Sequence, residues 1–401
     1  MTTRLFARTL TVLVILFVGA LSFACRAHIP PAPPPTPSRP ITTIPADGKV
    51  EQLLVRGRWL VWDYFIPPPA DGQLGSRQVG VYDLFKGRRV AAPPEAYTAV
   101  WLQGDDLYYD AVEKASGAYG LYVTNLLTGD TQKLPRPIPQ FQANFFNAES
   151  SFWQEMYPEL CQRITECGEN LVNRCGERIM RQSVNATQPT SLGVFDRNVT
   201  IAAVSSDLLV LSGKMASCDI KASSGPIRAI DLQTGQSWLL SYRTVSGGPM
   251  VYLVAVYDRT VAYMLEPAWA TRVVEVLPGQ TPRLLLDTRG IRPVGLAGPD
   301  VLLFVPNETT TSVSRGLVAY NVRTGQHQVL DTETTVLQAS GDGQHVAWVV
   351  GDNQIKLAHL TLAESGTPLA LPPGRPDWRL TEFKPMEWPT LPPLLTFTPS
   401  P

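Results

Sequence analysis

The sequence predicts an all-β protein, a seven-bladed β-propeller with four antiparallel strands in each blade. Three observations lead to this prediction. A short turn motif recurs with its key residues in a fixed phase, its copies lie about 40 to 50 residues apart, and a second hairpin pattern precedes each copy. Repeats of this length and strand content are typical of propeller blades.

In four copies of the turn motif, an Asp or Asn precedes a Gly by four residues. The Asx side chain can accept hydrogen bonds from the turn backbone, and Gly readily adopts the positive φ that closes a hairpin. We therefore expect each copy to join the last two strands of a blade. The pairs are Asp83 and Gly87, Asn125 and Gly129, Asp231 and Gly235, and Asn321 and Gly325.

Three weaker turns bring the count to seven. Two of them lie at Gly279 and Gly366, and the third is predicted at 185–187, in the long gap between Gly129 and Gly235. The turn at Gly366 places the fourth strand of the last blade after it. Six or eight blades are the alternatives, because the count depends on the region around a cysteine-rich insertion.

The second hairpin of each unit is an apolar run, a tight polar turn and another apolar run, as at 49–64 and 335–350. Val, Leu, Ile, Tyr and Trp dominate these runs, as buried strands require. A single blade cannot bury both faces of its sheet, but a blade between two neighbours can.

The last unit, ASGDGQHVAWVVGDNQIKLAHL, resembles the secreted TolB-type and WD-like propeller repeats of bacterial lipoproteins, in which a Gly-Asp-Gly turn precedes an aromatic-rich strand. The string YVTN at 122–125 is similar to another bacterial propeller repeat. The resemblance spans 49–371 and implies the fold only, with no ligand or catalytic residue transferred.

The first 24 residues are predicted to be a signal peptide, because arginines precede an apolar run at 9–24 that is short for a membrane-spanning helix. Ser22 and Ala24 suit an ordinary signal peptidase, whereas Ala24 and Cys25 resemble a bacterial lipobox that departs from the usual pattern at Ser22 and Phe23. Five cysteines are an odd number, and lipidation of Cys25 leaves four that can pair. We therefore expect a lipid-anchored protein of the bacterial cell envelope, with an N-terminal transmembrane anchor or free secretion as alternatives.

The lipidated Cys25 and a proline-rich linker occupy 25–48, which we expect to be an extended spacer. The propeller is predicted at 49–372 and a partly disordered tail at 373–401. The aromatic segment at 377–388 of this tail is expected to pack back on the propeller or to help close the ring.

The four remaining cysteines are Cys161, Cys167, Cys175 and Cys218. The first three lie in an insertion at about 151–180, between the second and third strands of blade three, and Cys218 lies in the equivalent connection of blade four. We expect one disulfide within the insertion and one from it to Cys218, with the pairing open. A metal site is the alternative, but the sequence has no CxxC pair and no nearby histidine.

Connections between second and third strands are long and varied, which favours a binding face there. Its aromatic and apolar candidates are Tyr64, Phe65, Trp153, Tyr157 and Met215. The alternative is that each of these side chains covers its own loop or a blade edge.

The sequence contains no HExxH, GxSxG or phosphate-loop motif, and we expect no catalytic residue, cofactor or metal. The formal net charge of −1 and the absence of a basic patch argue against nucleic acid as a partner. Asp105, Asp106 and Asp342 are expected to form turns. The chain is expected to be a monomer by itself.

We therefore expect a non-catalytic module that binds another envelope protein or a glycan. The alternative is a propeller enzyme of the lyase or glycoside hydrolase type, with carboxylates from several blades at the channel mouth. A single sequence does not distinguish the two.

Overall fold

The computed structural model is built entirely from β-strands in the part of the chain it describes. Those residues are 40–68, 75–112, 119–134, 145–147, 149–166, 170–183, 186, 188–195, 199–213, 227–241, 250–266, 270–306, 315–362, 367–374 and 384–385.

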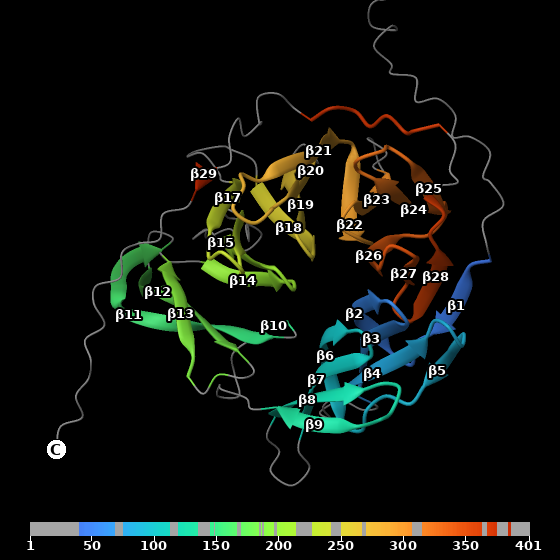
Figure 1. Ribbon diagram of the computed structural model, residues 1–401, viewed down its shortest axis with the longest axis horizontal. Coiled ribbons are helices and arrows are strands. Elements are labelled where there is room, and N and C mark those ends of the chain that lie inside the picture. Colours follow the sequence, from blue (N-terminus) through green and yellow to red (C-terminus); the bar gives the residue numbers. More distant parts are fainter. Residues whose placement is uncertain are drawn as a thin grey trace, which may run out of the picture. The chain divides into compact units, whose positions relative to one another are not determined.

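The strands form seven antiparallel sheets that follow one another around a ring (Figure 1). Blade one comprises β2 (Lys49–Arg56), β3 (Trp59–Ile66), β4 (Ser76–Asp83) and β5 (Arg88–Val90). Blade two comprises β6 (Ala96–Gln103), β7 (Asp106–Val112), β8 (Tyr119–Asn125) and β9 (Thr131–Leu134). Blade three comprises β10 (Phe145–Asn147), β11 (Ser150–Glu166), β12 (Asn170–Ser183) and β13 (Thr190–Phe195). Blade four comprises β14 (Val199–Val204), β15 (Leu208–Gly213), β16 (Ile227–Asp231) and β17 (Ser237–Ser241), with β29 (Lys384–Pro385) added at its edge.

The remaining three blades complete the ring. Blade five comprises β18 (Met250–Tyr257), β19 (Thr260–Glu266), β20 (Ala270–Glu275) and β21 (Arg283–Arg289). Blade six comprises β22 (Ile291–Leu296), β23 (Val301–Pro306), β24 (Leu317–Asn321) and β25 (His327–Asp331). Blade seven comprises β26 (Val336–Gly341), β27 (His345–Val350), β28 (Gln354–His359) and β1 (Thr42–Pro45). The predicted seven-bladed, four-stranded architecture is confirmed.

Blade seven takes its outer strand from the N-terminal side of the chain. β1 pairs with β28 from Thr42 opposite Leu357 to Pro45 opposite Gln354. The prediction that the fourth strand of blade seven follows Gly366 is therefore wrong, because β1 takes that place. The propeller thus begins before Lys49. The short edge strand tolerates Pro45 because proline is compatible with a sheet edge.

The Asx turns have the predicted geometry. Asp83 Oδ1 accepts hydrogen bonds from the backbone N–H groups of Phe85 and Lys86, each at 3.0 Å. Gly87 has a φ of 62° and donates its N–H to the Asp83 carbonyl at 2.8 Å. The same bonds recur at Asn125, Asp231 and Asn321. Thus the repeated motif closes the outer hairpin of four blades.

Two of the weaker predicted turns also fall between third and fourth strands. Gly279 has a φ of 65° and lies in the turn between β20 and β21. The position predicted at 185–187 lies in the connection between β12 and β13, although Asn185 and Thr187 themselves are outside the described residues.

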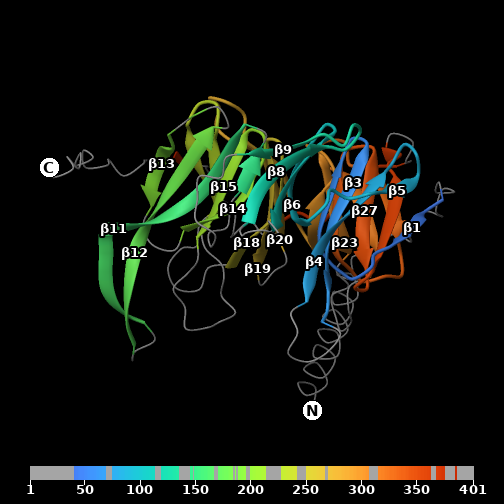
Figure 2. The same ribbon diagram turned by 90° about the horizontal axis from the view of Figure 1, so that it is seen from below.

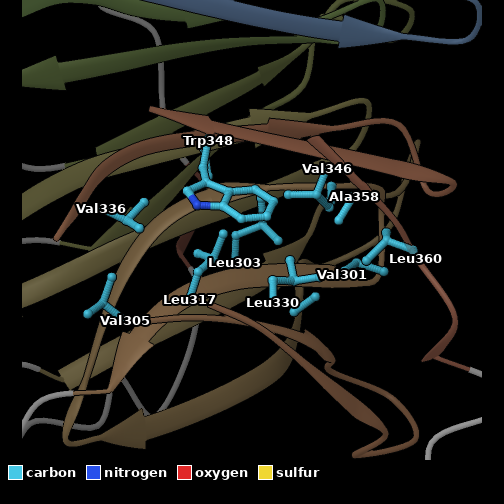
Figure 3. Packing of buried hydrophobic residues seen from close by; sticks show 13 residues of the cluster. Val301, Leu303, Val305, Leu317, Leu330, Val336, Val346, Trp348, Ala358 and Leu360 are labelled. Atoms are coloured by element: carbon cyan, nitrogen blue, oxygen red, sulfur yellow. The ribbon is translucent and has the colours of Figure 1, made fainter. Parts of the chain in front are cut away.

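Apolar clusters between neighbouring blades form the core. In one of them, Trp348 and Val346 of blade seven face Val301, Leu303 and Leu317 of blade six (Figure 3). Trp348, Leu303, Leu317 and Val346 are fully buried. Similar clusters join blades one and two, three and four, four and five, five and six, and seven and one. Burial between sheets is therefore the main contribution to stability that the structure shows.

The segment after blade seven contacts the outer edges of earlier blades. The Leu369 N–H donates to the Gly325 carbonyl of blade six at 2.9 Å, and Thr288 Oγ1 of blade five donates to the Pro372 carbonyl at 2.6 Å. Further along, β29 pairs with β17 of blade four, with Pro385 opposite Trp238. The described parts of this segment thus touch blades six, five and four in turn.

Blade three has a much longer central hairpin than its neighbours. β11 and β12 pair from Ser150 opposite Ser183 to Glu166 opposite Asn170, with a register shift between Tyr157 and Gln162. Figure 2 shows this hairpin extending past the ends of the adjacent strands. The predicted insertion therefore lengthens the second and third strands of the blade.

Candidate binding surface

The two ends of each blade carry different connections. In blade one, Asp83 at the end of β4 lies opposite Trp59 at the start of β3, so the turn from strand one to strand two and the turn from strand three to strand four share one end. We call this the short-turn face. Connections from second to third strands lie at the other end, as expected from the antiparallel order.

A pocket of ≈ 390 Å³ lies on the short-turn face between blades one and two. Its walls come from the turns between strands one and two of blades one and two, and from the outer turn of blade one. The lining residues are Arg56, Gly57, Arg58, Phe85, Gly104 and Asp105. Gly57 and Gly104 adopt the positive φ, of 55° and 56°, that their turns require, and neither residue adds a side chain to the pocket.

An ion pair holds Arg58 of the pocket lining in place. Arg58 Nη2 donates to Oδ2 of Asp83 at 2.6 Å, and Arg58 Nε lies 3.1 Å from both carboxylate oxygens. Asp83 is fully buried, and the hydrogen bond from Arg58 is the main reason that the pKa of this carboxyl lies below its ordinary value. The carboxylate also accepts the turn N–H groups, so Arg58 is fixed to the same Asx turn that presents Phe85.

Aromatic rings flank the Arg58 guanidinium. The centroid of the Trp59 ring lies 5.2 Å from its Cζ atom, and that of Phe85 lies 5.7 Å away. Trp59 Nε1 donates to Oδ1 of Asp105 at 2.8 Å, which joins blade one to the turn of blade two. The pocket is therefore built on side chains with fixed hydrogen-bond partners.

Two exposed apolar side chains stand at equivalent places in the outer turns of blades one and two. Phe85 lines the pocket, and Leu127 follows Leu126, whose N–H donates to the carbonyl of the pocket residue Asp105 at 2.8 Å. Phe85 is 71% exposed and Leu127 is 50% exposed, and each is two residues after the Asx of its outer turn. The same position is polar in blades four and six, where it holds Gln233 and Arg323. Aromatic residues and arginine are enriched at protein interfaces. We call Phe85, Leu127 and the pocket residues the blade-one surface.

Arg56 extends the surface toward the ring centre. Its guanidinium lies 4.3 Å from the Tyr257 ring centroid and 5.7 Å from that of Trp101, and it pairs with Asp258. Burial is the main cause that raises the pKa of Tyr257. Groups from blades one, two and five thus meet at this end of the ring.

The binding-face candidates predicted from the sequence do not gather in this way. Tyr64 is 5% exposed and donates its hydroxyl to Gln78 at 2.9 Å, and Trp153 is 2% exposed and donates Nε1 to Glu155 at 2.9 Å. Both rings are buried, and Tyr64 packs in the cluster between blades seven and one. Their role at a binding face stays a prediction. Phe65 is half-buried. The Tyr157 side chain and Met215 lie outside the described residues.

The side chains of the predicted lipidation and disulfide sites lie outside the described residues. Cys25, Cys167 and Cys218 are not among the described residues, and for Cys161 and Cys175 only the backbone is described. Lipidation and disulfide formation therefore stay predictions.

Asp63 is a buried carboxyl whose pKa is shifted upward. It is 3% exposed between blades one and two, and its Oδ1 accepts the Ala99 N–H at 2.8 Å. Burial raises the pKa of this carboxyl to about 7. Such a shift is common at active sites, but this side chain is buried and bonds the backbone of the next blade, which fits a structural role.

The predicted turn formers are in place. Asp342 Oδ1 accepts the N–H groups of Gln344 and His345, at 2.9 and 2.7 Å. Asp105 lies in a turn, and Asp106 begins β7 and accepts a bond from Asn125 at 2.9 Å. Among the described residues, no group of three or more His, Cys, Asp and Glu side chains could hold a metal ion. The described part of the chain also has no helix long and apolar enough to cross a membrane.

Comparison with known proteins supports the fold. The chain resembles an oligogalacturonate lyase in complex with manganese, with 12% identity, a TM-score of 0.50, and coverage of 80% of this chain and 91% of that one. It resembles an oligogalacturonate lyase from Vibrio parahaemolyticus at 10% identity, with the same TM-score and coverage of 80% and 92%.

A third similar structure is the Pyrococcus horikoshii acylaminoacyl peptidase, at 9% identity and a TM-score of 0.53. The match covers 80% of this chain and 52% of the peptidase, so the chain spans about half of that protein. No protein-family model and no curated protein sequence matches the chain. At these identities the similarities show the propeller fold alone.

The blade-one surface was not predicted from the sequence. The turns on this face are short, whereas the long and varied connections that predict a binding face lie at the other end of the blades. The sequence signal for this surface is a difference at one turn position. Phe85 and Leu127 are apolar there, whereas blades four and six have polar residues.

Proposed function

We propose that this chain is a non-catalytic propeller that binds another envelope protein through the blade-one surface while Cys25 anchors it to a membrane. The exposed Phe85 beside the arginine-lined pocket is the observation that supports binding. Asp83 holds the backbone of Phe85 in its turn, and Arg58 lies against the Phe85 ring before any partner arrives. Little conformational entropy is therefore lost at Phe85 on binding.

A protein partner fits this surface better than a nucleic acid or a charged polymer. Arg58 and Arg56 are already paired with Asp83 and Asp258, so neither presents an uncompensated charge. An apolar side chain of the partner would enter the ≈ 390 Å³ pocket and contact Phe85, with Leu127 at the side.

Site-specific photo-cross-linking in cells tests the proposal. A benzophenone amino acid at position 127 should give a discrete adduct in the full chain, and the adduct should be lost with Phe85→Ala. Leu337 is the matched control, because it is 70% exposed and lies at the start of β26, at the opposite end of its blade. The probe at 337 should give no such adduct.

The captured protein must then be purified and its affinity measured. Phe85→Ala should weaken binding by about tenfold or more, whereas Leu337→Ala should leave the Kd unchanged. Equal adducts from both positions, or equal affinity of the two variants, would refute the surface. Formation of new reducing ends when the purified chain is incubated with a polysaccharide would instead favour the enzyme alternative.

The membrane anchor has its own test. Cys25→Ser should move the chain from the membrane fraction to the soluble fraction while the cross-link from position 127 to a purified partner persists. Membrane retention of this variant would exclude lipidation of Cys25 as the anchor.

A further inference from the structure

The extended hairpin of blade three has little support beyond the blade itself. β13 pairs with Glu177–Arg181 of β12, and β10 pairs only with Ser150–Phe152 of β11. In the described chain, the outer part of the hairpin therefore pairs only with itself, as a two-stranded ribbon. Such ribbons are only marginally stable in water, so a cross-link would have a large effect on this one.

Two cysteine positions adjoin the first residue pair of the ribbon's outer register. The outer register begins with Gln162 opposite Arg174. Cys161 and Cys175 are the next residues toward the blade, one on each strand. The register shift follows at once, because residues 158–161 of β11 and Cys175 alone of β12 lie between the pairing of Gln162 with Arg174 and the pairing of Tyr157 with Gly176. Continuing the outer register by one residue places Cys161 opposite Cys175. Residues opposite each other in an antiparallel pair have Cα atoms about 4.5 to 5.5 Å apart, which is within the range of about 4.4 to 6.8 Å that disulfides need.

The same register excludes the other pairs within the ribbon. Glu166, which precedes Cys167, lies opposite Asn170. Asn170 is five residues from Cys175 along β12, about 16 Å at about 3.3 Å per residue. Cys161 lies a similar distance from Glu166 on β11. Both separations exceed the Cα distance of about 7 Å beyond which a disulfide requires backbone movement.

We infer that Cys161 and Cys175 form a cross-strand disulfide that staples the ribbon of blade three. This leaves Cys167 and Cys218 as the second pair of thiols. In the test reaction, oxidised glutathione is the oxidant. Each protein thiol loses its proton, one S–S bond forms in the protein, the S–S bond of glutathione breaks, and two molecules of reduced glutathione are released. The inference is therefore tested without reference to the compartment or the proposed partner.

Trypsin separates the four cysteines, which makes the pairing directly measurable. Cleavage after Arg163, Arg174 and Arg178 places Cys161, Cys167 and Cys175 on different peptides, and CGER contains Cys175 alone. Cleavage after Lys214 and Lys221 gives MASCDIK, which contains Cys218. The full chain is oxidised with glutathione, alkylated in denaturant and digested without reduction, and the linked peptides are identified by mass spectrometry.

The expected product is CGER joined to the peptide that ends in ELCQR. Cys167→Ser should leave this product unchanged, whereas Cys161→Ser should abolish it and make Cys175 available to alkylation. Linkage of CGER to ITECGENLVNR or to MASCDIK would overturn the inference. So would complete alkylation of Cys161 and Cys175 after oxidation of a chain that retains its β-sheet circular dichroism.

Discussion

Arg56 in blade one donates through both Nη atoms to Oδ1 of Asp258 in blade five, at 3.3 Å, although 202 residues separate the two. Blades one and five are not neighbours in the ring, so this contact joins them without the sheet packing that connects adjacent blades. The Tyr257 ring beside Asp258 contacts the same guanidinium. The contact therefore stabilises the ring across its short-turn end.

Arg56→Ala should lower the free energy of unfolding by on the order of 1 to 2 kcal/mol. The ion pair is partly exposed and contributes about 0 to 1 kcal/mol, and the cation–π contact adds about 0.5 to 1 kcal/mol. Urea unfolding followed by tryptophan fluorescence measures the change. Arg88→Ala, an exposed arginine in β5, is the control, and an equal loss in both variants would show that the cross-ring contact adds nothing.

Asp63→Asn should stabilise the protein at neutral and alkaline pH. Because the folded pKa of about 7 lies above the ordinary value of 3.8, the folded protein binds more protons than the unfolded chain between these values. The stability that comes from protonating Asp63 in the folded protein is fully present below about pH 4 and is lost as the pH rises to about 7. The Asn side chain can still accept the Ala99 N–H without becoming charged.

The measurement is the urea midpoint of both proteins from pH 4.5 to 8.5. The advantage of Asp63→Asn should grow between pH 4.5 and 7 and then level off, at up to about 4 kcal/mol for a shift of this size. A constant difference across the range would mean that Asp63 does not titrate there in the folded protein.

Asp331→Ala should destabilise the contact between blades six and seven by about 3 kcal/mol or more. Asp331 is 8% exposed and accepts bonds from Lys356 at 2.7 Å and Trp348 Nε1 at 3.2 Å, and the variant leaves both donors unpaired. Burial raises the pKa of Asp331, but the bonds from Lys356 and Thr334 outweigh it and hold the pKa well below its usual range.

The pH dependence of this variant has the opposite sign to that of Asp63→Asn. A depressed pKa contributes stability that is present above the unfolded value of 3.8 and is lost as the pH falls toward the folded value. The difference between wild type and Asp331→Ala should therefore shrink in acid, below about pH 4. Asp352→Ala, an exposed turn residue, is the control and should lose little at any pH.

Removal of β1 should open the ring. Ile44 is 2% exposed and packs in the cluster between blades seven and one, and the four residues of β1 form the outer edge of β28. A chain that starts at Lys49 should melt at a lower temperature than one that starts at Pro40, by calorimetry. Equal melting temperatures would show that β1 is dispensable for closure.

Much of the fold could be predicted because its turns are encoded locally. Asp83 and Gly87 specify the outer hairpin of blade one through contacts within five residues, and the same chemistry repeats in phase along the chain. Ring closure could not be predicted in this way. Thr42 pairs with Leu357, which is more than 300 residues away in the sequence. β1 is also short and contains a proline. The sequence around Gly366 resembles a further hairpin turn, which predicts the wrong outer strand.

The candidate surface was harder to predict for a different reason. Tyr64 and Trp153 lie in strands, where successive side chains point to opposite faces and both faces of a blade are covered by neighbours. Sequence position alone therefore did not separate their buried rings from exposed ones. Phe85 is exposed because the Asx turn places it outside the sheet, and this follows only once the turn geometry of Asp83 is known.

The strand β1 also decides where mechanical load enters the propeller. It is the first described strand, and every residue from Cys25 to Ile41 is joined to the ring through Thr42. Tension on an N-terminal tether would reach the backbone hydrogen bonds between β1 and β28 before it reached any other strand. The seam of the ring is thus the point at which a pulling force would first be resisted.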